Sequence, residues 1–191
     1  MSVWRCASLS SEHLWTASIF QIDATWLALT GLYALALVVV GWRLFKEARR
    51  PILDRDALRF WAIVFGVVAL FAVNRIFNLQ FLVTLAGRCE AAGEGWYESR
   101  RPFQFALIVT FAVAGAAALA LAVKRTREAD RRLVLIGLCA LAVLIAARAV
   151  SFHWAEAVLA FKIAGLSLNG LAEAAALAPV LAGAAHKRRR Y

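Results

Sequence analysis

The chain has 191 residues, of which 63% are hydrophobic and 18% are charged, and its mean hydropathy is +0.70. Soluble domains are usually about 45–50% apolar, so this composition excludes an ordinary water-soluble domain and indicates a membrane protein. The net charge of +10 is high enough for a nucleic-acid-binding protein, but the positions of the basic residues indicate membrane topology instead.

The apolar residues are gathered into long stretches. A helix needs about 20 apolar residues to cross roughly 30 Å of hydrocarbon, and these stretches are long enough to do so. We therefore predict an all-α, polytopic membrane helix bundle that forms a single domain over residues 1–191. Its five transmembrane helices are expected at residues 26–45, 60–84, 103–123, 133–151 and 163–185.

The basic residues predict the orientation of this bundle. Most of them fall in the first and third connections and in the C-terminal HKRRR sequence, and cytoplasmic segments of membrane proteins are enriched in Lys and Arg. The N-terminus is therefore expected outside and the C-terminus in the cytoplasm, as an odd number of spans requires. The residues assigned to these three segments are Arg43, Lys46, Arg49, Arg50, Arg55, Arg59, Lys124, Arg125, Arg127, Arg131, Arg132, Lys187, Arg188, Arg189 and Arg190.

The second predicted helix carries polar residues near its outer end. Asn74, Arg75 and Asn78 fall within an arc of about 100° on a regular helix, so they are expected to share one face. A charged side chain near the bilayer centre costs roughly 2.5–3.5 kcal/mol, so Arg75 is expected to face the bundle. There it would form a structural pair with Glu or bind an anionic group; the alternative is an arginine that extends to the outer interface.

The second connection, GRCEAAGEGWYESRRPFQ (87–104), places Arg100 and Arg101 side by side at the expected outer surface. Adjacent guanidinium groups suit phosphate or carboxylate recognition, because Arg binds such groups through two parallel hydrogen bonds. The alternative is pairing with the glutamates of the same loop. Cys89 lies in this loop, and the sequence leaves open whether it forms a disulfide with Cys6.

The fourth and fifth predicted helices supply further polar residues. Arg148 lies within an apolar segment, and His153 follows it next to Trp154, where it is either an interfacial aromatic residue or part of a site. Lys162, Asn169 and Glu173 fall within about 40° on one helix. An unpaired carboxylate in the membrane is costly, so Glu173 is expected to pair with Arg75 or Arg148. Taken with the second helix, these positions predict a polar chamber in the outer half and almost nothing comparable in the inner half.

Several of these stretches resemble a known group of proteins. The pattern N-x-x-x-N-L-Q at residues 74–80, the stretch GWYESRRPFQ at 95–104 and a later R-x-x-S-F-H at 148–153 are similar to those of small multipass bacterial inner-membrane proteins with no established activity. The resemblance implies a multipass inner-membrane location and an outer-face site, and it implies no reaction.

Two classes of function are compatible with the predicted chamber. The first is a binding or accessory subunit that holds an anionic group or the head group of a lipid or other amphiphile. The second is a membrane-embedded transferase or peptidase acting at the outer leaflet, with Cys89 or Ser151 as nucleophile and His153 as base. We favour the first class, because Ser151 and His153 are two residues apart and point away from each other on a regular helix. Its predicted ligand-binding residues are Asn74, Arg75, Asn78, Arg100, Arg101, Arg148, His153, Asn169 and Glu173.

The expected partners follow from the same residues. The three histidines form no pattern typical of a metal or haem site, so no metal or cofactor is expected. The partners are expected to be membrane lipid and either a second copy of the chain or another membrane protein, but not nucleic acid.

Overall fold

The computed structural model describes residues 23–79, 110, 113, 115–117, 119–120, 124, 126–149, 162–163 and 166–186. Within these residues the fold is helical apart from one short pair of strands. The elements are α2 (Ala24–Ala48), α3 (Arg55–Phe77), α6 (Ala129–Ala149), β1 (Lys162–Ile163), β2 (Leu166–Ser167) and α8 (Leu168–Ala185).

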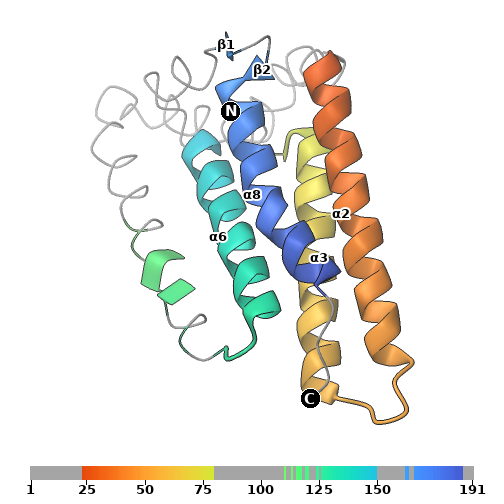
Figure 1. Cartoon of the computed structure of the whole chain (residues 1–191). Helices are drawn as coiled ribbons and strands as arrows, with labels where there is room; N and C mark the ends of the chain where they lie inside the picture. The colour runs from red at the N-terminus through yellow and green to blue at the C-terminus, as the bar shows by residue number, and fades with distance from the viewer. Residues whose placement is uncertain are drawn as a thin grey trace, which may run out of the picture.

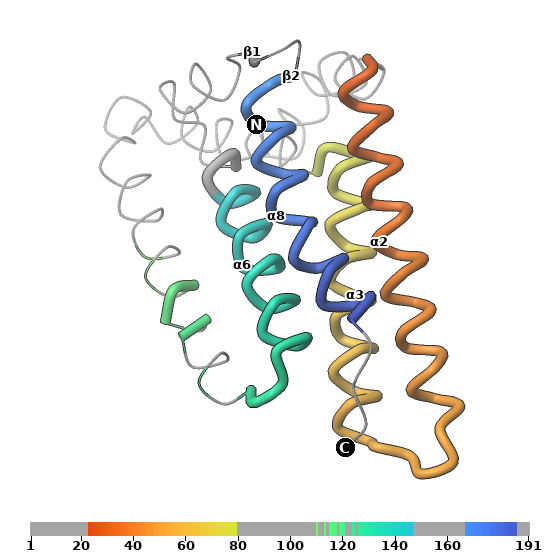
Figure 2. The backbone as a smooth tube through the Cα atoms, in the orientation of Figure 1, coloured from red at the N-terminus to blue at the C-terminus, as the bar shows by residue number. Residues whose placement is uncertain are grey.

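The helices stand side by side in a bundle (Figure 1). Helices α2 and α8 run in one direction, and α3 and α6 run in the opposite direction (Figure 2). Helix α8 packs against both α2 and α6, and α2 also packs against α3. Because of these contacts, α8 joins the α2–α3 hairpin to α6. The antiparallel pair β1–β2 directly precedes α8.

The bundle buries a narrow apolar core and leaves many large apolar side chains exposed. On α2 the buried residues recur every three or four positions, as on one face of a helix. Large apolar side chains cover the outer faces of the same helices, for example Val38, Ile63 and Leu70. Helices α2, α3 and α8 are each long and apolar enough to cross a membrane. The prediction of a helical protein with membrane-spanning segments is thus confirmed in this coarse form, and the count of five spans and their orientation stay predictions.

Helix α3 begins and ends earlier than the predicted span 60–84. It begins at Arg55 because the Asp54 carboxylate accepts hydrogen bonds from the backbone N–H groups of Asp56 and Ala57. It ends at Phe77 because Asn78 adopts the left-handed conformation, with φ 49° and ψ 45°, which is a common way for a helix to stop. The prediction that Asn78 shares a helix face with Asn74 and Arg75 is therefore wrong.

Helix α8 begins later than the predicted span 163–185. Ser167 caps its first turn, and the Ser167 hydroxyl accepts a hydrogen bond from the backbone N–H of Gly170 at 3.1 Å. Lys162 lies in β1, before the helix. Asn169 and Glu173 therefore share one face of α8, but the prediction that Lys162 continues this stripe is wrong.

Close packing between α6 and α8 depends on glycine, and we expect Gly137→Ala to lower the free energy of unfolding by about 1–3 kcal/mol. A Cβ atom at Gly137 would lie 2.6 Å from Val180 Cγ2 and 2.7 Å from the backbone oxygen of Ala176, and the backbone of a packed helix cannot move away cheaply. Unfolding in detergent measures the change. Gly31→Ala is the matched control, because a Cβ there meets nothing within 4 Å. Equal stability of the two variants would contradict the packing argument.

Candidate functional site

Three polar side chains from three helices meet between α2, α3 and α8. The Glu173 carboxylate of α8 accepts a hydrogen bond from the Tyr33 hydroxyl at 3.2 Å and pairs with Arg75 Nη1 at 3.3 Å. The Glu173 side chain is 2% exposed and that of Arg75 is 13% exposed. The prediction that Glu173 pairs with an arginine of the apolar segments is confirmed. We call Tyr33, Arg75 and Glu173 the Glu173 cluster.

The helices bring the Glu173 cluster together through their buried faces. Tyr33 belongs to the buried stripe of α2, and Glu173 belongs to that of α8. The start of α8 lies close to α2 because Gly170 has no side chain: a Cβ at Gly170 would lie 3.0 Å from Thr25 Cγ2. Arg75 comes from the last turn of α3, so the cluster lies towards the end of the bundle at which α2 and α8 begin.

Buried polar atoms without hydrogen bonds accompany this ion pair. Within the described part of the chain, Thr30 Oγ1, Asn169 Oδ1 and Arg75 Nε are buried and have no hydrogen-bond partner. Thr30 and Asn169 lie three and four residues before Tyr33 and Glu173 respectively, on the same faces of α2 and α8. A buried polar atom left without a hydrogen bond costs about 1–3 kcal/mol. These atoms therefore give the region unused capacity to bind a polar group.

Only some of the residues predicted for the outer chamber can be placed. Arg75 and Glu173 pair as described above, and Asn169 lies one turn before Glu173 on the same face of α8. Asn74 lies one residue from Arg75 on α3. Asn78 is the C-cap of α3. The backbone of Arg148 belongs to α6, and its side chain lies outside the described residues, as do Cys89, Arg100, Arg101, Ser151 and His153. The enzyme hypothesis therefore stays a prediction.

Tyr33 was not among the residues predicted for the chamber. A tyrosine in an apolar span keeps a hydroxyl group that needs a hydrogen-bond partner, and Tyr33 follows Leu29 and precedes Ala36 at the spacing of one helix face. That spacing, together with the polar hydroxyl, could have placed Tyr33 in the chamber.

A second group of buried charges lies at the opposite end of the bundle. Arg43 of α2 pairs with Glu47 at 3.2 Å and with Asp130 of α6 at 3.0 Å. Arg43 Nη1 also donates a hydrogen bond to the backbone oxygen of His186 at 2.6 Å, and its guanidinium lies 5.2 Å from the centre of the Trp61 ring. We call Arg43, Glu47 and Asp130 the Arg43 network. It links α2 to α6 and to the residue that follows α8.

The Arg43 network corrects two predictions. Arg43, near the end of the predicted span 26–45, was counted with the basic residues of the first cytoplasmic connection, but it is buried within α2. The end of the bundle that the basic residues predict to be cytoplasmic was expected to hold almost no polar groups, but Glu47 and Asp130, which are 1% and 3% exposed, lie at that end. The positive-inside rule does not distinguish an exposed arginine from a buried one near a helix end. Arg43 is buried because it contacts two acidic side chains and the carbonyl of His186.

Neither a metal site nor a known relative identifies these clusters. Among the described residues, no three His, Cys, Asp or Glu side chains are grouped so that they could hold a metal ion. No protein-family model, curated protein or solved structure matches the chain.

Proposed function

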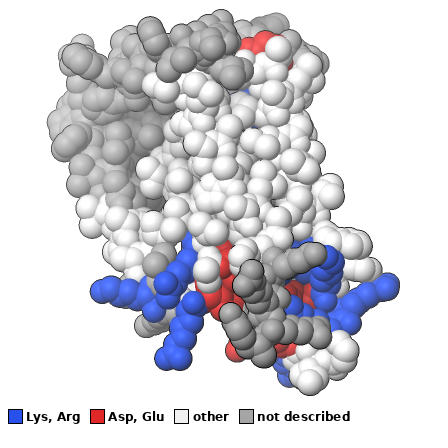
Figure 3. All heavy atoms as spheres, viewed as in Figure 1, with Lys and Arg blue, Asp and Glu red and all other residues white. Residues whose placement is uncertain are grey.

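We propose that the protein is a multipass protein of a bacterial inner membrane, with five spans and with the Arg43 network at its cytoplasmic end. Lys and Arg side chains gather at this end of the surface (Figure 3), and cytoplasmic segments of membrane proteins are rich in these residues. Besides α2, α3 and α8, the proposed spans are α6, which is free of charged residues between 133 and 147, and the predicted segment 103–123. The Glu173 cluster then lies in the outer half.

We infer that the protein is a binding or accessory subunit whose outer polar chamber holds the head group of an amphiphile. The observation that carries this inference is the set of buried polar atoms without hydrogen bonds beside the Glu173 cluster, namely Thr30 Oγ1, Arg75 Nε and Asn169 Oδ1. These atoms are buried between helices that are proposed to span the membrane, so a ligand reaches them most directly from the lipid phase. The head group of an amphiphile would supply the missing hydrogen bonds while its acyl chains stay in the lipid.

The charges of the cluster favour one kind of head group. Glu173 neutralises Arg75, so the ion pair by itself presents no net charge. Asn169 Oδ1 and Arg75 Nε require a donor and an acceptor respectively, and a hydroxyl or amide group supplies both. We therefore propose a head group that carries hydroxyls or amides. An anionic head group would also need the guanidinium of Arg100, Arg101 or Arg148.

Loss of the ligand on removal of Asn169 Oδ1 tests this proposal. Native mass spectrometry of the purified protein is expected to find one retained amphiphile per chain. Asn169→Leu is expected to weaken retention by about two- to tenfold, the equivalent of one hydrogen bond, and it leaves the pair of Arg75 and Glu173 in place. Ala175→Leu is the matched control, because it adds the same side chain at an exposed position of α8. If no amphiphile is retained, or if Asn169→Leu retains it like the control, the proposal is wrong.

A further inference from the structure

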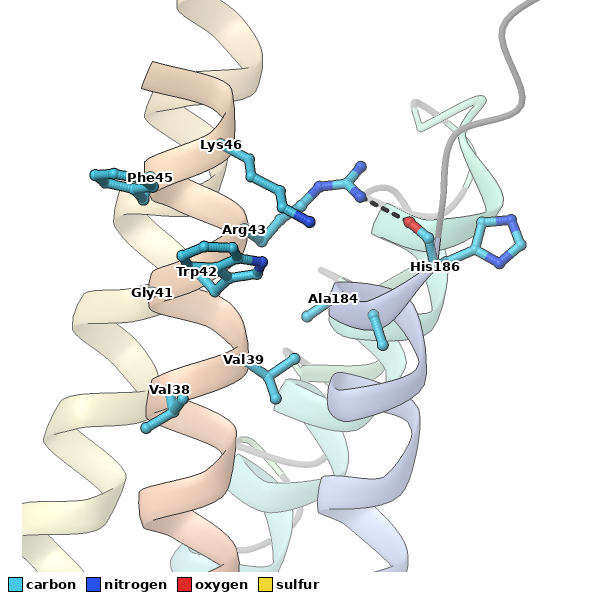
Figure 4. Close-up of a pocket in the computed structure, with 10 residues that line it drawn as sticks. Val38, Val39, Gly41, Trp42, Arg43, Phe45, Lys46, Ala184 and His186 are labelled. Atoms are coloured by element: carbon cyan, nitrogen blue, oxygen red, sulfur yellow. Dashed lines mark hydrogen bonds between the residues drawn. The ribbon is translucent and has the colours of Figure 1, made fainter. Parts of the chain in front are cut away.

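A groove lies at the end of the bundle that holds the Arg43 network, between the last turns of α2 and α8. It has a volume of about 650 Å³, which is in the range of small-molecule sites. Val38 and Val39 line its apolar part, Ala184 and Ala185 form the α8 side, and Trp42, Arg43, Lys46 and His186 lie at its polar end. In Figure 4, Val39 and Lys46 extend from α2 towards α8.

Among the described residues that line this groove, Lys46 is the cation that is available to a ligand. Arg43 already forms ion pairs with Glu47 and Asp130. It also donates a hydrogen bond to the His186 carbonyl, which Figure 4 shows as a dashed line. Lys46 is exposed, and its Nζ lies 5.1 Å from the centre of the Trp42 ring. Within the described residues, no carboxylate lies within ion-pair distance of Lys46. Its charge is therefore free to meet an anion.

The C-terminal ends of α2 and α8 lie at this groove. The C-terminal end of a helix carries partial negative charge, which opposes anion binding. Here this effect is offset. The carbonyl of His186, the residue after α8, accepts the hydrogen bond from Arg43. At the end of α2, Arg49 and Arg50 follow Lys46, and their basic side chains oppose the helix dipole. From residue 43 to residue 50 the chain carries four basic side chains, Arg43, Lys46, Arg49 and Arg50, and one acidic side chain, Glu47.

We propose that this groove binds an anionic phospholipid from the adjacent membrane leaflet. The phosphate contacts Lys46, and the upper part of an acyl chain lies along Val38 and Val39. The apolar wall continues onto the lipid-facing side of α2, where Val38 is 68% exposed. Trp42, which is 57% exposed, lies beside Lys46, and tryptophan is enriched at the level of lipid head groups.

The arrangement fits a lipid better than a protein segment. The apolar wall and the cation follow each other along one helix, in the order of the acyl chain and phosphate of a phospholipid. Basic pockets between transmembrane helices on the cytoplasmic side are known sites for acidic head groups. The site is separate from the Glu173 cluster, and it binds a charged group rather than a hydroxyl-bearing one.

Binding of phosphatidylglycerol tests the proposal. The purified full-length protein is titrated with phosphatidylglycerol, phosphatidylcholine or soluble glycerol phosphate, and bound lipid is counted by native mass spectrometry. We expect one phosphatidylglycerol per chain to bind more tightly than phosphatidylcholine, and glycerol phosphate to bind weakly because it lacks acyl chains. Lys46→Gln is expected to weaken phosphatidylglycerol binding about fivefold.

Two further variants distinguish lipid binding in the groove from lipid attraction by the positive charge of the whole surface. Ala185→Trp fills the groove while it keeps every charge, and it is expected to weaken phosphatidylglycerol binding at least as much as Lys46→Gln. Arg59→Gln removes one exposed positive charge from α3 at the same end of the bundle and is expected to bind like the parent. The proposal is overturned if the two lipids bind equally, if glycerol phosphate binds as well as the lipid, or if Lys46→Gln and Ala185→Trp both bind like Arg59→Gln.

Discussion

Arg43→Ala is expected to lower the free energy of unfolding by about 3–5 kcal/mol, the usual cost of removing one partner from a buried ion pair. The substitution leaves Asp130 buried without its cation from α2 and removes the hydrogen bond to the His186 carbonyl. It also removes the guanidinium from the face of Trp61. Chemical or thermal unfolding of the protein in detergent measures the loss.

Two other substitutions show which property of Arg43 matters. Arg43→Lys keeps the charge but cannot reach Glu47, Asp130 and the His186 carbonyl together, since lysine lacks the planar fork of nitrogens. It is expected to recover only part of the lost stability. Arg49→Ala removes an exposed arginine that lies over the Phe45 ring, and it is expected to cost less than about 1 kcal/mol. A loss for Arg43→Ala as small as that for Arg49→Ala would contradict the structural role of the network.

The helical spans could be predicted because they depend on composition alone. A run of apolar residues long enough to cross a membrane leaves few alternatives to a helix, so α2 lies close to the predicted span 26–45. The pairing of Glu173 with either Arg75 or Arg148 was predictable for a similar reason. An ionised side chain in an apolar span needs an opposite charge, and the spans offered few candidates.

The helix boundaries and the Arg43 network could not be predicted from composition. The end of α3 depends on one backbone conformation at Asn78, and the start of α8 depends on a strand pair and the Ser167 cap. These are local features that apolar content does not report. Arg43 and Glu47 did carry a signal, because they continue the three- and four-residue spacing of buried positions on α2. The partner that makes their burial favourable, Asp130, comes from a distant part of the chain.

The pair between Arg75 and Glu173 is expected to be strongly coupled. Arg75→Leu and Glu173→Leu should each lower the free energy of unfolding by about 3–5 kcal/mol, because each leaves the opposite charge buried without its partner. The double variant leaves no buried charge in the pair, so its loss is expected to be smaller than the sum of the two by about 1–3 kcal/mol. Unfolding of all four proteins in the same detergent gives the coupling energy.

Tyr33, the third member of the Glu173 cluster, shows how large a loss of stability one hydrogen bond to Glu173 causes. Tyr33→Phe removes only the hydroxyl that donates to Glu173, and it is expected to cost about 0.5–1.5 kcal/mol, which is typical of one hydrogen bond. If the losses of Arg75→Leu and Glu173→Leu simply add in the double variant, the two charges do not stabilise each other. If instead Tyr33→Phe costs as much as Glu173→Leu, then the hydroxyl rather than the guanidinium is what makes a buried carboxylate tolerable at this position.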